Sequence, residues 1–320
     1  MRWVRARHGG DVLAGVVVGA GDGGQVHALR DVTVLGLVAT GGLAEAARRA
    51  QEDPDVVVPL TAVELLAPIE TPPSIRDFMA FEQHVAGMGL LAGARPTVPD
   101  VWRDQPLFYF SNPASLVGPY DDVAMPPGCE VFDFELEVAA VVGPHPDGLP
   151  LRDLTPEESA ACLVGYVLLN DWSARDLQMR EMQGPLGPCK GKDSAITLGP
   201  WLLSADELPG LAGGVCDVEL QVDVGERFRG RDRLDSMAWT FAELAAYASR
   251  GTELRPGDLL GSGTAGDGCL AERWGRQGRE SVDSLHIGET VRLDGGPLGS
   301  TASRVVGPAP VRAPLRRRAG

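Results

Sequence analysis

Apolar and acidic residues alternate over residues 131–137, and a run of five apolar residues follows them. A period of two predicts a strand and places Glu135 and Glu137 on the same face. The next apolar strand, residues 164–170, delivers Asp171 at its end. Neighbouring carboxylates beside a core-forming run repel each other unless a cation lies between them. The three acids therefore predict a cation site rather than a solvated strand edge.

Polar side chains suited to ligand binding follow that second strand, namely Arg175, Gln178 and Lys192. Strand ends and loops are where binding and catalytic sites are usually built. The alternative for Arg175 and Lys192 is a surface charge, or an ion pair with Asp176 or Asp193. The alternative for Gln178 is a position on a helix surface.

Residues 1–66 predict a small β-rich module in which Gly-rich turns separate short strands. The expected strands lie at residues 2–8, 13–19, 25–29 and 63–68, the last leading out of the module, and the one expected helix lies at residues 43–53. No residue of this module suggests catalysis, so we expect it to serve packing or dimerisation.

Residues 74–84 predict the start of a helix after a Thr-Pro-Pro boundary. Ser74 is the expected N-cap, and Asp77 stands three residues later, as in a capping box. His84 lies two helical turns further along the same face. On this pattern alone Asp77 is a cap and His84 is a structural histidine, so a functional interpretation needs support from other residues.

The rest of the chain adds further strands and one clear amphipathic helix. The expected strands lie at residues 106–112, 195–203, 218–224 and 283–293, and the helix lies at residues 239–249. Because strands dominate and helices are few, the fold class is mainly β with some α (α+β), built from antiparallel or mixed sheet.

Gly261, Gly263 and Gly266 match the G-x-G-x-x-G pattern of dinucleotide-binding proteins. No apolar-periodic helix is expected after them, and no βαβ repeat surrounds them. A glycine-rich loop that brings the backbone close to a bound group is therefore the preferred interpretation.

The chain has 320 residues, a net charge of −15, 44% hydrophobic residues and 23% charged residues. This composition is ordinary for a globular protein. The acidic balance argues against nucleic acid or an anionic membrane surface as partner. A local cluster of Arg and Lys can still hold a small anionic substrate.

Five scattered cysteines without a C-x-x-C pair indicate a reducing cytoplasm, with neither a disulfide framework nor a zinc ribbon. No apolar stretch is long enough to span a bilayer. Gly9, Gly10 and Asp11 interrupt the one segment that resembles a signal peptide. We therefore expect a cytoplasmic protein.

Five motifs in collinear order over residues 67–308 resemble the fumarylacetoacetate hydrolase family. They are Ser-Ile-Arg-Asp77-Phe-Met-Ala-Phe-Glu-Gln-His84, Phe-Asp-Phe-Glu135-Leu-Glu137, Asn-Asp171-Trp-Ser-Ala-Arg175-Asp-Leu-Gln178, Gly-Lys192-Asp and Gly-Ser-Gly-Thr264. The resemblance implies a mixed β-sandwich roll as the catalytic domain (67–310). A small N-terminal β-rich domain (1–66) is expected before it and a basic flexible tail (311–320) after it.

The resemblance also implies a divalent cation, Mg²⁺ or Ca²⁺ with Mn²⁺ as a third candidate, and no organic cofactor. The implied ligands are Asp77, Glu135, Glu137 and Asp171. This agrees with the residues themselves, because an all-oxygen site suits a hard cation.

The catalytic residues implied by the resemblance are a water-activating pair, His84 and Glu272, with Lys192 and Gln178 as donors to an oxyanion. Two further residues are implied for the substrate. Arg175 would hold a substrate carboxylate, and Thr264 would bind another oxygen. The implied reaction is carbon–carbon hydrolysis of a β-diketone or acylpyruvate.

The chain departs from the long fumarylacetoacetate hydrolases around the substrate. Met79 and Met182 stand where those enzymes place tyrosines, whereas Tyr109 keeps a third. Thioethers in place of phenols leave a more apolar and adaptable pocket. The resemblance therefore implies the reaction type more firmly than the substrate.

Two alternatives to hydrolysis stay open. The same cation site would serve a decarboxylase or a keto–enol tautomerase or isomerase of a 2-oxo acid, which needs no water-activating pair. A catalytically silent, metal-dependent binding protein is the other. The joint presence of Asp77, His84 and Glu272 favours hydrolysis. We further expect a homodimer that takes a small anionic 2-oxo or β-diketo acid.

Overall fold

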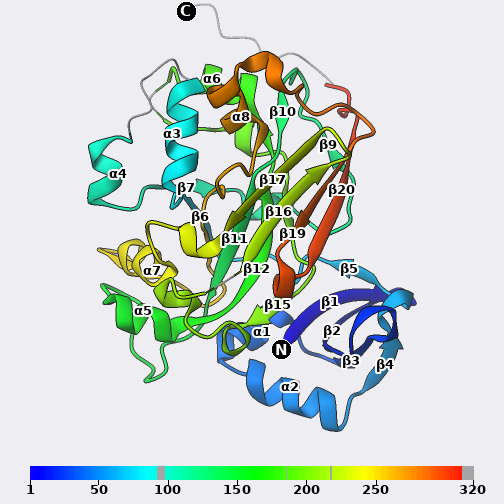
Figure 1. The fold of residues 1–320 in the computed structure, drawn as a ribbon. Coiled ribbons are helices and arrows are strands. Elements are labelled where there is room, and N and C mark those ends of the chain that lie inside the picture. Colours follow the sequence, from blue (N-terminus) through cyan, green and yellow to red (C-terminus); the bar gives the residue numbers. More distant parts are fainter. Residues whose placement is uncertain (92–97, 185, 217, 312–320) are drawn as a thin grey trace, which may run out of the picture.

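The computed structural model describes residues 1–91, 98–184, 186–216 and 218–311. Within these residues thirteen strands form one mixed sheet at the centre of the molecule (Figure 1). Ten of them follow one path, in the spatial order β4 (Val56–Pro59), β3 (Gln25–Leu29), β2 (Asp11–Val18), β1 (Arg2–His8), β15 (Leu202–Ser204), β12 (Leu163–Asp171), β11 (Leu136–Val142), β18 (Leu259–Gly261), β6 (Ile75–Phe78) and β7 (Phe108–Ser111). Beside this path lie β5 (Glu64–Leu66), β14 (Ile196–Leu198) and β8 (Leu116–Val117).

The two central strands, β11 and β12, are buried on both faces. In β11, Leu136, Val138 and Ala140 belong to one hydrophobic cluster, whereas Ala139 and Val141 belong to another. Side chains alternate between the faces of a strand, so a strand covered on both sides is apolar along most of its length, and here the polar residues Glu137, Asn170 and Asp171 lie only at the ends. This explains the apolar run that follows the acidic alternation in the sequence.

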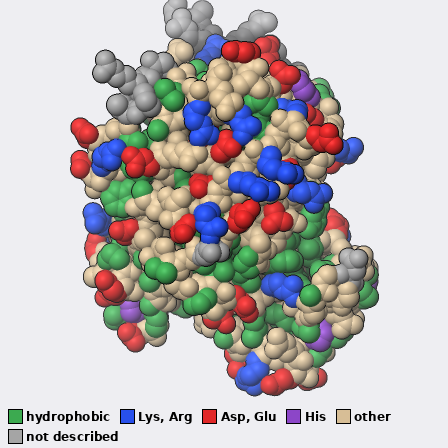
Figure 2. All heavy atoms as spheres, viewed as in Figure 1, with side chains coloured by type: hydrophobic (Ala, Val, Ile, Leu, Met, Phe, Trp, Pro, Cys, Tyr) green, Lys and Arg blue, Asp and Glu red, His purple; other side chains and the backbone are tan. Residues whose placement is uncertain are grey.

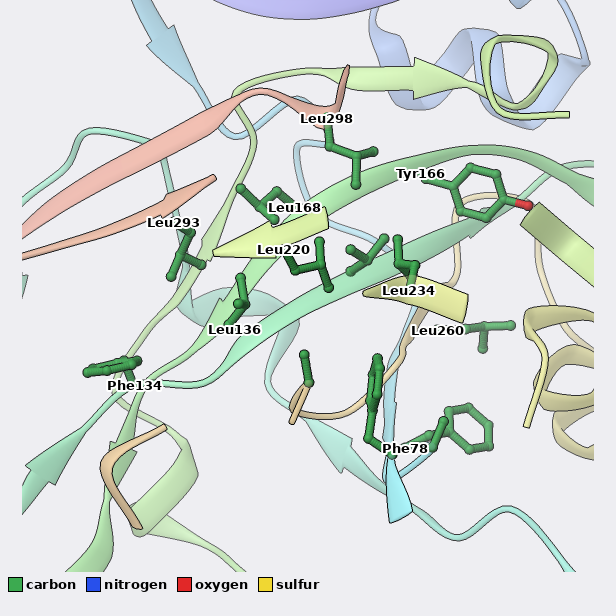
Figure 3. Close-up of a cluster of buried hydrophobic side chains, with 14 of the residues drawn as sticks. Phe78, Phe134, Leu136, Tyr166, Leu168, Leu220, Leu234, Leu260, Leu293 and Leu298 are labelled. Atoms are coloured by element: carbon green, nitrogen blue, oxygen red, sulfur yellow. The ribbon is translucent and has the colours of Figure 1, made fainter. Parts of the chain in front are cut away.

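One face of the central sheet packs against a smaller sheet of five strands. These are β17 (Phe228–Arg233), β16 (Glu219–Val224), β19 (Thr290–Asp294), β20 (Ser300–Val306) and β9 (Val123–Ala124). Leu136 and Leu168 of the central strands share a core with Leu220 and Leu293 of the smaller sheet (Figure 3). A short pair, β10 (Phe132–Asp133) with β13 (Ser173–Ala174), completes the strands.

The N-terminal strands continue the central sheet, because β1 hydrogen-bonds to β15 in antiparallel register. Two helices, α1 (Val34–Thr40) and α2 (Leu43–Glu52), share a hydrophobic cluster with residues of β11 and β12. The predicted strands and helix of this module are present, together with α1 and β4, which the sequence did not predict. Its division into a separate domain stays a prediction.

The remaining helices are short and lie on the outside of the sheets (Figure 1). They are α3 (Glu82–Leu91), α4 (Asp100–Asp104), α5 (Pro156–Cys162), α6 (Arg175–Glu181), α7 (Phe241–Ser249) and α8 (Leu270–Gln277). Capping boxes begin α5 at Thr155 and α7 at Thr240, so side-chain oxygens satisfy N–H groups of the first turn. The α+β class and the mixed sheets match the prediction.

The helix predicted over residues 74–84 is wrong in its first half. Residues 75–78 form strand β6, and all four are buried between β7 and β18. Ser74 caps no helix, and its hydroxyl donates to Asp258 instead. Tertiary pairing overrides the local capping pattern, and the helix begins only at Glu82.

Two other expectations need correction. A helix does follow the glycine-rich loop, since α8 begins at Leu270. The closing strand pair is not contained in residues 283–293, because β19 pairs with β20 over residues 290–294 and 300–304. Residues 312–320 of the predicted basic tail lie outside the described residues. None of the described helices combines the length and the apolar character needed to cross a membrane.

Acidic and basic side chains are mixed on the face that carries β16 and β17 (Figure 2). Arg229 pairs with Asp223, and Arg304 pairs with Asp122. Exposed pairs of this kind contribute little to stability. On the face in view, the charges do not gather into a patch of one sign that would attract a polyanion.

Close packing of α3 on α8 brings the first turns of the two helices together, and it depends on Gly87. A Cβ added at Gly87 would lie 2.3 Å from Cγ of Glu272, whose side chain is fully buried. His84 lies one turn before this glycine on α3. The contact therefore sets the distance between the two predicted catalytic residues.

We predict that Gly87→Ala lowers the free energy of unfolding by about 1–3 kcal/mol, because the added methyl group overpacks a buried contact. The better helix propensity of alanine, about 1 kcal/mol, offsets only part of this loss. Chemical denaturation measures the change. Gly213→Ala is the control, since nothing lies within 4 Å of its added Cβ; equal stability of the two variants would refute the packing argument.

Candidate active site and metal centre

A cavity of about 670 Å³ opens at one end of the central sheet. Eleven of the thirteen residues predicted for the site line it, and the other two, Asp171 and Glu272, contact lining residues. Apolar side chains, including Phe108, Phe110 and Leu186, form much of the remaining wall. The structure therefore brings the whole predicted set together in one place.

Neighbouring strands bring the polar groups into one row. Tyr109 on β7 lies opposite Asp77 on β6, which lies opposite Gly261 on β18. Glu137 follows on β11, and Asp171 ends β12. The row explains why residues so distant in the sequence meet.

Four carboxylates, three in this row and Glu135 beside it, are buried with exposed fractions of 4% or less. They are Asp77, Glu135, Glu137 and Asp171. Three of their oxygens have no hydrogen-bond partner among the residues that the structure describes, namely Asp77 Oδ1, Glu137 Oε2 and Asp171 Oδ1. Buried charges in proteins are otherwise paired or bind metals. A Cβ at Gly261 would lie 2.5 Å from Asp77 Oδ1 and 3.3 Å from Glu137 Oε2, so glycine keeps this space open. The donor set and the space fit a hard divalent cation.

The titration of these acids reflects their crowding. Burial and the neighbouring Asp171 raise the pKa of Asp77 to about 7. Burial, followed by Asp77 and Glu135, raises the pKa of Glu137 well above its usual range. Burial alone would raise the pKa of Glu135 too, but Lys192 and Arg175 outweigh it and hold that pKa below its usual range.

Tyr109 closes one side of the carboxylate cluster. Its hydroxyl oxygen lies 2.9 Å from Asp77 Oδ2 and also contacts Asp171 Oδ2. Burial raises the pKa of the phenol well above its usual value, so its proton stays in place at neutral pH. One phenolic proton serves two carboxylates, which leaves their negative charge only partly compensated.

Lys192 lies inside the carboxylate cluster. Its ammonium donates to Asp171 at 2.6 Å and to Glu135. Burial alone would lower the pKa of Lys192, but Asp171 and Glu135 raise it above its usual value. The alternative of an ion pair with Asp193 is wrong, since Asp193 pairs with Lys190.

Arg175 is buried and has protein partners on all three guanidinium nitrogens. Nε lies 2.8 Å from Asp133, Nη2 lies 2.7 Å from Glu135, and Nη1 donates to Gln178 at 3.1 Å. The alternative of a surface charge or a pair with Asp176 is therefore wrong. Its role as a clamp for a substrate carboxylate stays a prediction, and these partners show that it also supports the acidic cluster.

The predicted water-activating pair is assembled at the meeting point of α3 and α8. His84 Nδ1 lies 3.5 Å from Glu272 Oε2, which also accepts the Asp267 N–H at 2.9 Å. Burial alone would raise the pKa of Glu272, but His84, the Asp267 N–H and Arg276 hold it below its usual range. The carboxylate of Glu272 therefore stays ionised. The side chain of His84 lines the cavity, and its Nε2 makes no hydrogen bond to a described residue.

The other predicted site residues, three for the substrate and Gln178 for the oxyanion, lie around the same space. Met79 and Met182 are 38% and 56% exposed at the cavity wall. Thr264 is buried, and its hydroxyl donates to Glu137 at 3.4 Å. Gln178 lines the cavity and accepts from Arg175. Their contacts are compatible with the predicted roles, which stay predictions.

Sequence reasoning missed two buried residues beside the site. Asp133 accepts from the backbone N–H groups of Leu270 and Ala271 at 2.9 and 3.0 Å, so it anchors the start of α8. It is the first acid of the alternation over residues 131–137, and that pattern was the available signal. Cys269 lies 3.8 Å from His84 Nδ1 and accepts from the Glu272 N–H. Nothing in the sequence marks it beyond its place before α8.

Residues 74–306 match the family described as "Fumarylacetoacetate (FAA) hydrolase C-terminal". That stretch is well over half of the chain. The chain belongs to the fumarylacetoacetate hydrolase family. Fumarylacetoacetase of Arabidopsis thaliana is 31% identical over 289 residues, which cover 74% of this chain and 68% of the plant protein. The chain spans 54% to 68% of the length of the fumarylacetoacetases it matches.

Solved structures share this fold over nearly all of the chain. Maleylpyruvate hydrolase from Sphingobium, in complex with manganese (II) ion and pyruvate, superposes with a TM-score of 0.70 at 21% identity, covering 97% of this chain and 100% of that one. The 5-carboxymethyl-2-hydroxymuconate delta-isomerase from Mycobacterium smegmatis gives 0.68 at 23% identity, with coverages of 96% and 100%. The shared fold thus includes the N-terminal strands as well as the sheets that carry the candidate site.

We predict that Gly261→Ala weakens Mg²⁺ binding at least about tenfold, because its methyl group enters the space between Asp77 and Glu137. Isothermal titration calorimetry measures the affinity. Gly213→Ala, an exposed glycine with open space around it, is the control. Unchanged Mg²⁺ affinity in a folded Gly261→Ala protein would show that the cation binds elsewhere.

Mg²⁺ affinity is predicted to depend on pH through Asp77. Its raised pKa of about 7 means that the cation-free protein holds a proton there at lower pH. The cation must displace this proton, so affinity is highest above pH 7 and falls as the pH drops, by up to about tenfold per unit. Calorimetry in buffers of different ionisation enthalpy counts the protons released. An affinity that stays constant from about pH 6 to about pH 8 contradicts the assignment.

Proposed function

We propose that this protein is a divalent-cation-dependent hydrolase that cleaves a carbon–carbon bond in a β-diketone or acylpyruvate-type acid. The observation that carries the proposal is the pairing of His84 with an ionised, buried Glu272 on the wall of the cavity that holds the carboxylate cluster. Hydrolysis needs a water-activating pair beside the cation site. Decarboxylation and tautomerisation need the cation site but not the pair.

The residues that would hold the cation are Asp77, Glu135, Glu137 and Asp171, and Mg²⁺, Ca²⁺ and Mn²⁺ all suit such oxygen ligands. A bound cation supplies Lewis-acid stabilisation of negative charge on substrate oxygens. The manganese in the Sphingobium hydrolase supports this assignment.

The protein's own groups then perform the proton transfers. Glu272 orients His84 through Nδ1, which leaves Nε2 to take a proton from water. The resulting hydroxide attacks one carbonyl carbon of the substrate. Lys192 and Gln178 line the cavity and can donate to the oxyanion that forms. Collapse breaks the carbon–carbon bond, which releases a carboxylic acid and an enolate, and the proton held by His84 returns to the products.

The cavity favours a small acid with an apolar end. Lys192 and Arg175 are the cations on its wall among the described residues, whereas Met79, Phe110 and Met182 are apolar and partly exposed. We infer a 2-oxo or β-diketo acid as substrate, held by its charged end near the cluster. A cytoplasmic homodimer is part of the proposal.

A decarboxylase, or a keto–enol tautomerase or isomerase, is the second candidate. The observation that favours it is the same fold in the Mycobacterium smegmatis isomerase, with full coverage of that chain. Such reactions need the cation and enolate stabilisation but not the proton acceptor at His84.

We predict that His84→Ala and Glu272→Gln each lower the rate of hydrolysis by about 10²–10⁴-fold, because general-base assistance is lost. The assay incubates purified protein with acylpyruvates, fumarylpyruvate, fumarylacetoacetate and oxaloacetate, with Mg²⁺ or with EDTA, and identifies products by mass. Two acid fragments that together carry one added water, absent with EDTA, are the expected result.

His286→Ala, which changes a histidine on the exposed loop before β19, is the matched control and keeps the parent rate. Release of carbon dioxide or formation of an isomer that persists in His84→Ala would reject hydrolysis in favour of the second candidate. No turnover of any compound by the parent protein with Mg²⁺, Ca²⁺ or Mn²⁺ would count against both.

A further inference from the structure

We propose that His84, Cys269 and Glu272 form a second metal site, for a thiophilic divalent cation such as Zn²⁺, and that its occupation inhibits the enzyme. The three side chains are buried, and one ligand atom from each lies within 4.8 Å of the other two. The metal-binding part of the proposal is independent of the proposed function, and only the inhibition rests on it.

The distances between the ligand atoms suit a tetrahedral ion. At the tetrahedral angle, zinc bonds of about 2.0 Å to nitrogen and oxygen and about 2.3 Å to sulfur place the ligand atoms about 3.3–3.5 Å apart. His84 Nδ1 lies 3.5 Å from Glu272 Oε2 and 3.8 Å from Cys269 Sγ. These two separations exceed the ideal ones by no more than about 0.3 Å, and all three ligand atoms lie within 4.8 Å of one another. Because His84 lines the cavity, water can occupy the fourth position.

The chemistry of this donor set differs from that of the carboxylate cluster. One nitrogen, one sulfur and one carboxylate oxygen suit zinc and other borderline ions, whereas an all-oxygen set suits Mg²⁺ or Ca²⁺. The site at His84, Cys269 and Glu272 should therefore prefer zinc, and the carboxylate cluster should prefer Mg²⁺ or Ca²⁺. Burial raises the pKa of Cys269, so the entering metal displaces a thiol proton.

Inhibition follows from which atoms the ion would occupy. A metal on His84 Nδ1 and Glu272 Oε2 replaces the contact that orients the histidine. Glu272 would then bind the metal instead of orienting the imidazole. His84 would no longer be free to accept a proton from water.

Cobalt(II) titration in excess Mg²⁺ tests the site, because Co²⁺ occupies zinc sites and its thiolate bond gives a near-ultraviolet charge-transfer band. The full-length parent protein should develop this band with one equivalent of Co²⁺, and Zn²⁺ should remove it. Cys269→Ser should show no band. This variant should still fold, because residue 269 is the N-cap of α8 and serine is a favoured N-cap. His84→Ala, as a second variant, should weaken Co²⁺ binding by about tenfold or more.

Cys162→Ser, which removes another buried cysteine, is the control and should keep the band. A band that survives in Cys269→Ser, or none in the parent, overturns the proposal whether or not the protein turns over any substrate. Where turnover is found, each variant's rate with Zn²⁺ is divided by its own rate without it. Zinc should lower this ratio more in the parent than in Cys269→Ser, and equal ratios would reject the inhibitory role.

Discussion

An excess of buried negative charge dominates this structure. Five carboxylates, Asp77, Asp133, Glu135, Glu137 and Asp171, lie together, and the buried cations that contact them in the described part of the chain are Lys192 and Arg175. Burying charges is costly unless they are paired. The raised pKa values of Asp77 and Glu137 express that cost. A divalent cation would bring the cluster close to neutrality, so cation binding and stability of the site are coupled.

The fold supplies the geometry that makes such a cluster possible. Strands covered on both faces hold the acids on rigid backbone, and the close approach at Gly261 leaves room between two of them. Asp133 ties this cluster to α8 through two backbone N–H groups. Because α8 also carries Glu272, one buried acid links the cation site to the proton-transfer pair. Changes at either site should therefore affect the other.

The sequence predicted the burial of the acids because their pattern is local. Alternation over residues 131–137 and a strand ending at Asp171 predict the burial of these acids directly, although the predicted strand is interrupted at residues 134–135, between β10 and β11. The resemblance to a family supplied Asp77, His84 and Glu272, which local patterns could not. The pattern around Asp77 even suggested a helix, whereas pairing with β7 and β18 makes it a strand. The contacts of Cys269 and the partners of Arg175 depend on residues far away in the chain, so no spacing rule could reveal them.

The central claim is that the buried carboxylates hold a divalent cation beside a water-activating histidine. Anomalous diffraction from crystals soaked in Mn²⁺ tests it most directly. The account predicts one strong peak among the side-chain oxygens of Asp77, Glu135, Glu137 and Asp171. No peak there, in crystals whose soak contains ample Mn²⁺, would contradict the claim and leave the excess of buried negative charge to be balanced by protons.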